Sequence, residues 1–439
     1  MVGAATRETM NDFGGNVSNT RRWTIVWLLF VAGVINYMDR AVVSVALPLI
    51  AADLHQGPAA KGVLLSSFFW SYALMQLPMG WCADRYDLRW FYAGGFALWS
   101  LACGLTGFAT SLAVMLVLRI LLGIGESVYL PGSVKIVSLL FDSRDRGLAS
   151  GLVNSGTRVG LAVGVPLIAW LVATLSWQKT FFILGFASLI WIVPWLAIFP
   201  PRIAVSRPQR PLAEKPRWQS LDRNLLGLCL GHIGFGYYWT LLVTWLPDYL
   251  VGARHMPIRK AGAYAVIPYL VFSISEPLGG WIADRMVKRG WNELRSRKAI
   301  VTFAFLTSLC LLPGGLVADD AAAVWLIGAA SMVGLATGNI LAMLQRSAPP
   351  NDVGVWTGIL NFVGNLAGIM APLAMGLLIA STGSYFPGLA SAVAVLLAGL
   401  PAYWWILTDR NIPRLPEVSY EQRVAVHVDD PETRAARNT

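Results

Sequence analysis

The chain has 439 residues, of which 56% are hydrophobic and only 13% are charged. Soluble domains carry about 25% charged residues, so the composition excludes a soluble enzyme, a disordered chain and a fibrous chain. The net charge of +10 would suit a nucleic-acid partner, but the cations lie between apolar segments, where they orient helices in a membrane. The composition therefore predicts a polytopic membrane protein that does not bind nucleic acid.

Apolar runs of about twenty residues, the length needed to cross a bilayer, predict twelve transmembrane helices. The first run begins at Trp23 and lacks a cleavage site, so we expect a retained span rather than a secretory signal. Only Asp319 and Asp320 mark the turn between spans nine and ten. The expected spans are 23–48, 62–82, 91–110, 113–138, 147–174, 179–200, 224–250, 260–282, 299–317, 322–345, 354–380 and 385–407.

A polar segment rich in Pro and Arg divides these spans into six plus six and predicts a linker. Alternate segments between the spans hold 25 of the 34 Lys and Arg residues, whereas the loops on the other side hold five. This excess predicts that the linker and both tails are cytoplasmic. The expected organisation is a tail (1–22), a six-helix half (23–200), the linker (201–223), a second half (224–408) and a tail (409–439).

Short motifs recur in the two predicted halves. The sequence GWCADR at 80–85 returns as GWIADR at 280–285, an offset of 200 residues. Leu47-Pro48 and Leu246-Pro247 match in the same order, and so do the Gly-x-x-Asn motifs of spans five and eleven. Three matches in one order predict two homologous halves, an architecture of transporters that bind substrate between their halves.

The repeated loop also predicts a gate. A glycine at a helix end permits close helix approach, and the aspartate can accept hydrogen bonds from helix N-termini or from an arginine of the other half. Such a cytoplasmic latch would break in each transport cycle. The alternative is a charge cluster that only orients the helices, which the second copy disfavours. The candidate gating residues are Gly80, Asp84, Arg85, Gly280, Asp284 and Arg285.

The doubled Gly-x-x-x-Asp-Arg loop resembles the signature of the major facilitator superfamily. Four further motifs resemble its anion:cation symporter family, and the resemblance covers residues 21–408. It implies an all-α integral membrane fold with two six-helix halves related by pseudo-two-fold symmetry. It also implies transport of organic acids such as hexuronates, aldonates, glucarate-type diacids or aromatic acids. The four motifs are NYMDR (36–40), Arg119 with GIGE (123–126), WLPDY (245–249) and NFVGNLAG (361–368).

Charged residues inside the apolar spans are the candidate site. A charge at the bilayer centre costs about 2.5–3.5 kcal/mol on insertion scales, so each should face a cavity or a partner. Asp39 and Glu126 lie on different spans, each with an arginine nearby, and an anion bound there would change the balance that sets their protonation. The alternative is that these charges form buried ion pairs that only lock the half together. The charges are Asp39, Arg40, Arg119, Glu126, Lys135, Arg158 and Glu276, with His232 as the lone intramembrane imidazole.

The resemblance implies a role for several of these positions. Asp39 and Glu126 match the family's proton-carrying acids, and Arg40 and Arg119 match arginines whose planar fork binds a carboxylate. The remaining implied substrate-binding residues are the cavity tyrosines Tyr37 and Tyr72 and the span-eleven amides Asn361 and Asn365.

Three further candidate substrate-binding residues depart from the family pattern. Thr157-Arg158 replaces Gln-Tyr of the sugar-acid transporters, and His232 replaces a glutamine of span seven. The loss of two amides and the gain of possible cations shift the expected substrate from a polyol monoacid toward an aromatic acid or an acid with a second carboxylate. The alternatives are that Arg158 bridges a glutamate at a helix interface and that His232 is a packed core histidine. Glu276 aligns with Gln76 and lies toward the second latch, so we expect it to be a latch partner, with a proton carrier as the alternative.

These observations predict a secondary transporter that couples an organic carboxylate to protons by alternating access. It needs no cofactor, and one chain in the lipid bilayer of a bacterial inner membrane should suffice. One alternative is an efflux antiporter of the same superfamily, whose cationic cargo the core arginines would repel. Another is a membrane enzyme such as an acyltransferase, which would need a catalytic histidine or a metal cluster, yet only His232 of four histidines is intramembrane.

Overall fold

A computed structural model of the chain describes residues 18–83, 85–141, 145–200, 222–349 and 353–409. The predicted tails and linker lie almost entirely outside these residues, as does Asp84 of the first latch. The described residues form helices joined by short turns, which confirms the all-α prediction.

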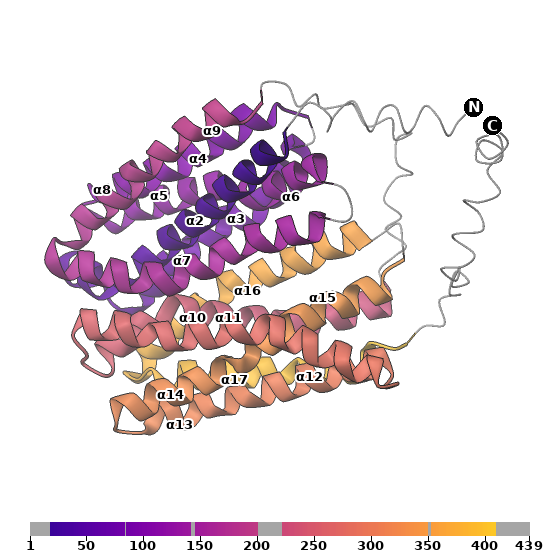
Figure 1. Ribbon diagram of the computed structural model, residues 1–439. Coiled ribbons are helices and arrows are strands. Elements are labelled where there is room, and N and C mark those ends of the chain that lie inside the picture. Colours follow the sequence, from indigo (N-terminus) through magenta and orange to yellow (C-terminus); the bar gives the residue numbers. More distant parts are fainter. Residues whose placement is uncertain (1–17, 84, 142–144, 201–221, 350–352, 410–439) are drawn as a thin grey trace, which may run out of the picture. The chain divides into compact units, whose positions relative to one another are not determined.

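The helices fall into two sets that follow the predicted halves, drawn from indigo to magenta and from pink to yellow in Figure 1. The first set is α2 (Asn19–Asp53), α3 (Pro58–Ala83), α4 (Leu88–Thr106), α5 (Leu112–Glu126), α6 (Tyr129–Leu140), α7 (Arg146–Thr174), α8 (Trp177–Ser188) and α9 (Ile192–Ile198). The second is α10 (Arg223–Gly252), α11 (Ile258–Lys288), α12 (Glu293–Thr307), α13 (Leu311–Leu316), α14 (Asp320–Ala330), α15 (Ala336–Ser347), α16 (Val353–Thr382) and α17 (Phe386–Ala398).

Each of the twelve predicted spans coincides with one helix or with consecutive helices that continue each other. Short 3-10 segments join α8 to α9, α12 to α13 and α14 to α15, and a π-helical segment (Ala402–Ile406) extends the last span. Asp319 caps α14 by accepting from the Ala322 amide, so the predicted turn between spans nine and ten is correct. Ten of the described helical segments are long and apolar enough to cross a membrane, and α3 and α4 are the spans outside this set.

Span four is interrupted directly after Glu126, where α5 ends and α6 begins. Pro131 lies in the first turn of α6, where its missing N–H is tolerated, but it cannot donate to the carbonyl of Ser127. The sequence therefore places a helix break beside a buried carboxylate.

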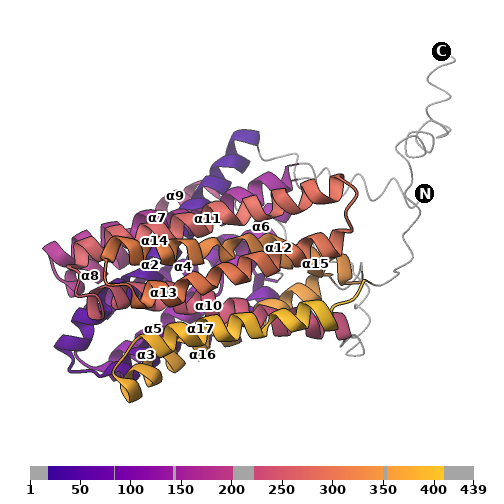
Figure 2. The same ribbon diagram turned by 90° about the horizontal axis from the view of Figure 1, so that it is seen from below.

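The two halves meet through long helices. In the structure α3 packs antiparallel along α16 and α7 antiparallel along α11, while α2 packs against α10, which runs in the same direction (Figures 1 and 2). α3 begins at Pro58 and α11 at Ile258, so the repeat offset of 200 residues carries over into equivalent helices. We call the end of the bundle with Ser18, Phe199 and Leu407 the tail end, and the end with the α2–α3 and α16–α17 turns the far end.

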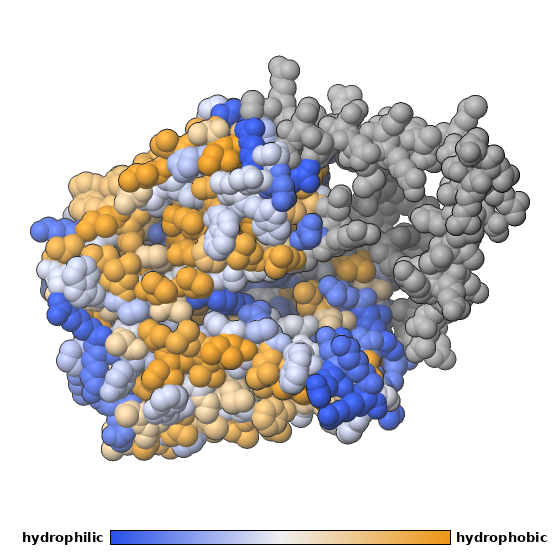
Figure 3. All heavy atoms as spheres, viewed as in Figure 1, coloured by the Kyte–Doolittle hydropathy of each residue, from blue (hydrophilic) through white to orange (hydrophobic). Residues whose placement is uncertain are grey.

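The surface agrees with a membrane environment. Large apolar side chains such as Trp27, Leu74, Val193 and Trp405 are more than half exposed, as expected of side chains that face lipid. On the face in Figure 3, apolar residues cover the middle of both halves and hydrophilic residues gather toward the two ends. The chain is a multi-pass membrane protein.

Candidate functional site

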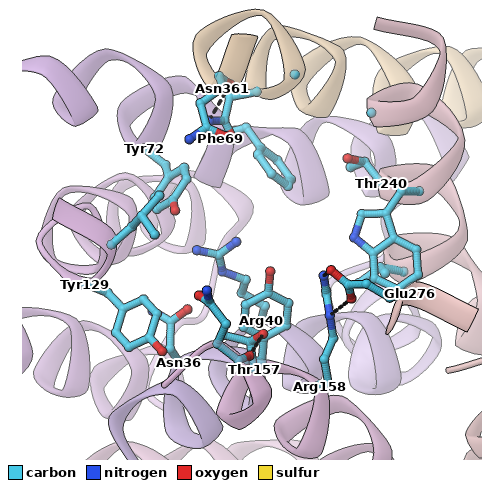
Figure 4. Close-up of a pocket in the computed structure, with 18 of the residues that line it drawn as sticks. Asn36, Arg40, Phe69, Tyr72, Tyr129, Thr157, Arg158, Thr240, Glu276 and Asn361 are labelled. Atoms are coloured by element: carbon cyan, nitrogen blue, oxygen red, sulfur yellow. Dashed lines mark hydrogen bonds and ion pairs between the residues drawn. The ribbon is translucent and has the colours of Figure 1, made fainter. Parts of the chain in front are cut away.

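A cavity of about 950 Å³ lies between the halves and is lined by α2, α3, α5, α6, α7, α10, α11, α15 and α16. Its volume lies within the range of small-molecule binding sites, about 300–1,000 Å³. Of the charged residues that the structure describes, four line it: Arg40, Arg119, Arg158 and Glu276. The predicted site residues Tyr37, Tyr72, Thr157, His232, Asn361 and Asn365 line it as well, and Figure 4 shows several of them around the open space.

Arg40 holds Glu126 and lies among aromatic rings. Its Nε donates to Glu126 Oε2 at 2.8 Å, and its guanidinium carbon lies 4.6 Å from the ring centroids of both Phe68 and Tyr72. Glu126 is fully buried and does not line the cavity, whereas Arg40 does. Glu126 is therefore linked to the cavity through its ion pair with Arg40. It pairs with Arg40 of α2 rather than with Arg119, which lies on the same helix as Glu126.

Arg119 is buried, and two of its nitrogen atoms have no hydrogen-bond partner among the described residues. Only 4% of the residue is exposed, yet it lines the cavity, and its Nε and Nη1 have no hydrogen-bond partner among the described residues. Leaving buried donors unsatisfied costs about 1–3 kcal/mol, more for a charged group. These donors can bind an anion that enters the cavity.

Asp39 lies behind the cavity wall. It is 1% exposed, and the Cys103 thiol donates to its Oδ1 across 3.3 Å, while its Oδ2 has no partner among the described residues. Its hydrogen-bond donor is thus a thiol, which sequence spacing did not indicate, in addition to the nearby arginines that it did indicate.

Arg158 and Glu276 join the two halves across the cavity. Arg158 of α7 donates from Nε and Nη2 to the two carboxylate oxygens of Glu276 on α11, at 2.8 and 3.2 Å (Figure 4). The rings of Phe272 and Trp239 lie 5.3 and 5.7 Å from the guanidinium. Of the two alternatives for Arg158, the bridge to a glutamate holds, and Glu276 is part of the cavity wall, as is its repeat partner Gln76.

The other predicted polar residues contribute neutral groups. The Thr157 hydroxyl donates to the Asn154 carbonyl at 2.7 Å, and the Asn365 amide donates to the Asn361 carbonyl at 3.0 Å. The His232 ring stacks on Phe235, and its Nδ1 is buried without a described partner. His232 thus combines the two alternatives, because it packs against an aromatic ring and also lines the cavity.

Comparison with known proteins identifies the family. The model described as Major Facilitator Superfamily matches residues 29–372. The chain belongs to this superfamily. It is 31% identical to a D-galactonate transporter of Escherichia coli (89% of this chain, 96% of that protein) and 30% identical to a hexuronate transporter of Bacillus subtilis (85% and 90%). A probable sulfoacetate transporter of Cupriavidus necator is 30% identical (83% and 89%).

These relatives assign the chain to the anion:cation symporter family within the superfamily, and they are membrane transporters rather than enzymes. The solved structure of a bacterial homologue of the human lysosomal transporter Spinster, in an inward-facing and occupied conformation, has the same fold. Its TM-score is 0.73 at 18% identity, covering 90% of this chain and 98% of the other.

The repeated loops of this superfamily member do not contact each other among the described residues. Asp284 accepts from Arg297 Nη2 at 3.0 Å within the second half, rather than from the first half as the latch hypothesis allowed. Arg85 and Arg285 lie over Trp81 and Trp281, their neighbours one helical turn earlier, at 3.9 and 5.6 Å. Asp84 lies outside the described residues.

The transporter has a second contact between its halves that sequence analysis missed. Lys61 at the start of α3 donates to Asp248 Oδ1 at 2.7 Å, and the Tyr385 hydroxyl donates to Asp248 Oδ2 at 2.8 Å. The sequence signal was the aspartate in WLPDY, an acid at the end of an apolar span, but its partner lies 187 residues away.

Glycines show that the halves are packed differently at the two ends of the bundle. At the far end, a Cβ on Gly62 would lie 2.7 Å from the Pro372 carbonyl, and one on Gly376 would lie 2.6 Å from the Pro58 carbonyl. A Cβ on Gly262 would likewise clash with Ala169. At the tail end four motif glycines would meet no described atom within 4 Å: Gly80, Gly151, Gly280 and Gly358. Gly151 and Gly280 also line the cavity, which therefore extends toward the tail end.

Proposed function

We propose that this transporter moves an organic carboxylate across the membrane together with protons, by alternating access. The observation that carries the proposal is Arg119, a buried guanidinium with unsatisfied donors that lines a cavity between two homologous halves. Relatives named for galactonate, hexuronate and sulfoacetate support an organic acid as the substrate.

Binding of a carboxylate can be coupled to a proton through Arg40. The substrate carboxylate binds Arg119 and competes with Glu126 for the guanidinium of Arg40. A carboxylate that loses its cation in a buried site is stabilised by taking up a proton. Substrate binding and protonation of Glu126 therefore favour each other, and this reciprocity is what symport requires. Asp39, one residue from Arg40 and buried, is the second proton-carrying acid of this proposal.

Alternating access is supported by the register of the glycines. Gly62 and Gly80 of α3 are 18 residues apart, as are Gly376 and Gly358 of α16, and 18 residues are about five helical turns. Each pair therefore lies on one helix face, so tilting α16 against α3 would bring Gly80 beside Gly358 as Gly62 now lies beside Gly376.

The same spacing holds for the other interface. Gly262 and Gly280 of α11, and Ala169 and Gly151 of α7, are again 18 residues apart. Both helix pairs can thus close at the tail end with the small-residue contacts that they use at the far end. The excess of cations on the tail side makes this the cytoplasmic side, so the structure corresponds to an inward-open state in this proposal.

The test is uptake by the purified protein in proteoliposomes. Thermal-shift screening against D-galactonate, D-glucuronate and benzoate first identifies an acid that binds the folded protein. An inward proton gradient should then drive accumulation of that acid, and a protonophore should abolish the accumulation. Uptake that responds neither to the proton gradient nor to the protonophore would contradict symport and indicate a uniporter or an exchanger.

A further inference from the structure

The ion pair between Arg158 and Glu276 bears on the charge of the substrate. We propose, on the basis of the proposed function, that the transporter selects monoanionic acids and rejects the dianionic acid of the same skeleton, because Glu276 occupies the arginine that a second carboxylate would need. The sequence favoured an aromatic acid or one with a second carboxylate, on the assumption that Arg158 is a free cation. The structure pairs it with Glu276 at two points.

Among the charges that line the cavity and their ion-pair partners, all are compensated except one, and the proposed function gives the buried Asp39 behind the wall a proton when the substrate is bound. Arg40 is paired with Glu126, and Arg158 is paired with Glu276. Among the described lining residues, Arg119 is the arginine without an ion pair. One carboxylate on Arg119 and Arg40 matches this excess. A second carboxylate would be an uncompensated charge in a buried site, which is strongly unfavourable.

The position of the Arg158–Glu276 pair also affects which part of a substrate can carry a charge. All three arginines belong to the first half, and the charged lining residue that the second half contributes is Glu276. The rest of that wall is neutral, and Figure 4 shows Thr240 and Asn361 on it. Its hydroxyl, amide, imidazole and aromatic groups belong to His232, Trp239, Thr240, Ser273, Asn361 and Asn365. A substrate held on Arg119 therefore presents its other end to neutral groups and one carboxylate, which suits hydroxyls or a ring and repels an anion.

Glu276 is not easily displaced from Arg158. The two hydrogen bonds use both carboxylate oxygens, and Phe272 and Trp239 flank the guanidinium. A diacid that took over Arg158 would leave Glu276 in the wall without its cation. Removing the negative charge of Glu276 frees Arg158 instead and turns the same position into an anion site.

The experiment compares matched acids on the purified full-length protein. The probes are D-galactonate with galactarate, D-glucuronate with D-glucarate, and benzoate with phthalate, each measured by thermal shift and calorimetry at neutral pH. Glu276 denies the second carboxylate of the diacid a charge-assisted hydrogen bond to Arg158. We therefore expect at least one monoacid to bind about tenfold tighter than its diacid. Glu276→Gln should shift this ratio toward the diacid by about tenfold or more. Arg158→Gln/Glu276→Gln should lose that shift.

The outcomes separate the two proposals. If none of the six acids binds the wild-type protein, the proposed function fails. If the diacid binds as tightly as the monoacid in every pair that binds, carboxylate binding stands and the monoanion proposal is overturned without recourse to any variant. An unchanged ratio in a folded Glu276→Gln protein overturns it equally. The exchange Arg158→Glu/Glu276→Arg keeps the pair, and its preference for the monoacid would support the proposal.

Discussion

Lys61 and Asp248 form an ion pair 2.7 Å long that ties the first half of the molecule to the second at the far end. Asp248 is fully buried and also accepts from the Tyr385 hydroxyl, so both of its oxygens are satisfied. The glycines that touch across the halves lie at this end, while the motif glycines of the tail end do not touch. In the proposed alternating access, the ion pair belongs to the closed side of the transporter and has to break when this side opens.

Replacing Lys61 by Met should destabilise the closed far end. Removing one partner of a buried ion pair costs about 3–5 kcal/mol because it leaves an uncompensated charge. Spin labels on Gln56 and Ser384, in turns of opposite halves, should report a longer distance in Lys61→Met. The control is Lys260→Met, whose partner Asp320 belongs to the same half. Equal distances in both variants would show that the pair does not hold the halves together.

A bulky residue at Gly280 should stop transport without unfolding the protein. A Cβ at this position meets no described atom within 4 Å, so the side chain of Gly280→Leu begins in open space in the present conformation. Closing the tail end against Gly151 would then be blocked. We expect substrate binding and thermal stability close to wild type, and loss of most of the uptake into proteoliposomes. Gly280→Ala should be milder, and full uptake by Gly280→Leu contradicts the proposed closure.

Much of the fold could be predicted because hydropathy is a local property. Span lengths, the six-plus-six division and the turn at Asp319 all depend on neighbouring residues. The cavity residues could be predicted only as a set, because charged groups inside apolar spans have to face water or a partner. Which of these residues pair with each other could not be predicted. Arg158 and Glu276 are 118 residues apart, and their contact depends on which helices become neighbours. For the same reason the thiol beside Asp39 carried no signal in the sequence.

Arg119→Lys should weaken binding of the carboxylate although it keeps the charge. The guanidinium offers a planar fork of donors to a carboxylate, which an ammonium group cannot reproduce. The expected loss is about 2 kcal/mol, or about thirtyfold in Kd by calorimetry. Arg254→Lys is the control, because Arg254 donates to the Val317 carbonyl outside the cavity. Unchanged affinity in Arg119→Lys would mean that this arginine is structural.

His232→Ala should lower affinity more mildly. The imidazole lines the cavity, and in the proposed function it forms one hydrogen bond with the neutral end of the substrate. The loss of such a bond is about 1 kcal/mol, or about fivefold in Kd. Thermal unfolding of both proteins separates this effect from lost packing against Phe235. If affinity is unchanged while stability falls, His232 serves only to fill the core.

In the proposed function protons drive uptake through Asp39, so a side chain without an acidic proton should uncouple the transporter. Asp39→Asn keeps the size and polarity of the side chain but cannot release a proton. The measurement is uptake of the identified acid into proteoliposomes, driven by an inward proton gradient and, separately, by exchange against the same acid inside. We predict that wild-type protein accumulates the acid in both assays, whereas Asp39→Asn exchanges it and no longer responds to the gradient. Gradient-driven accumulation by Asp39→Asn at the wild-type level would show that Asp39 does not carry the coupled proton.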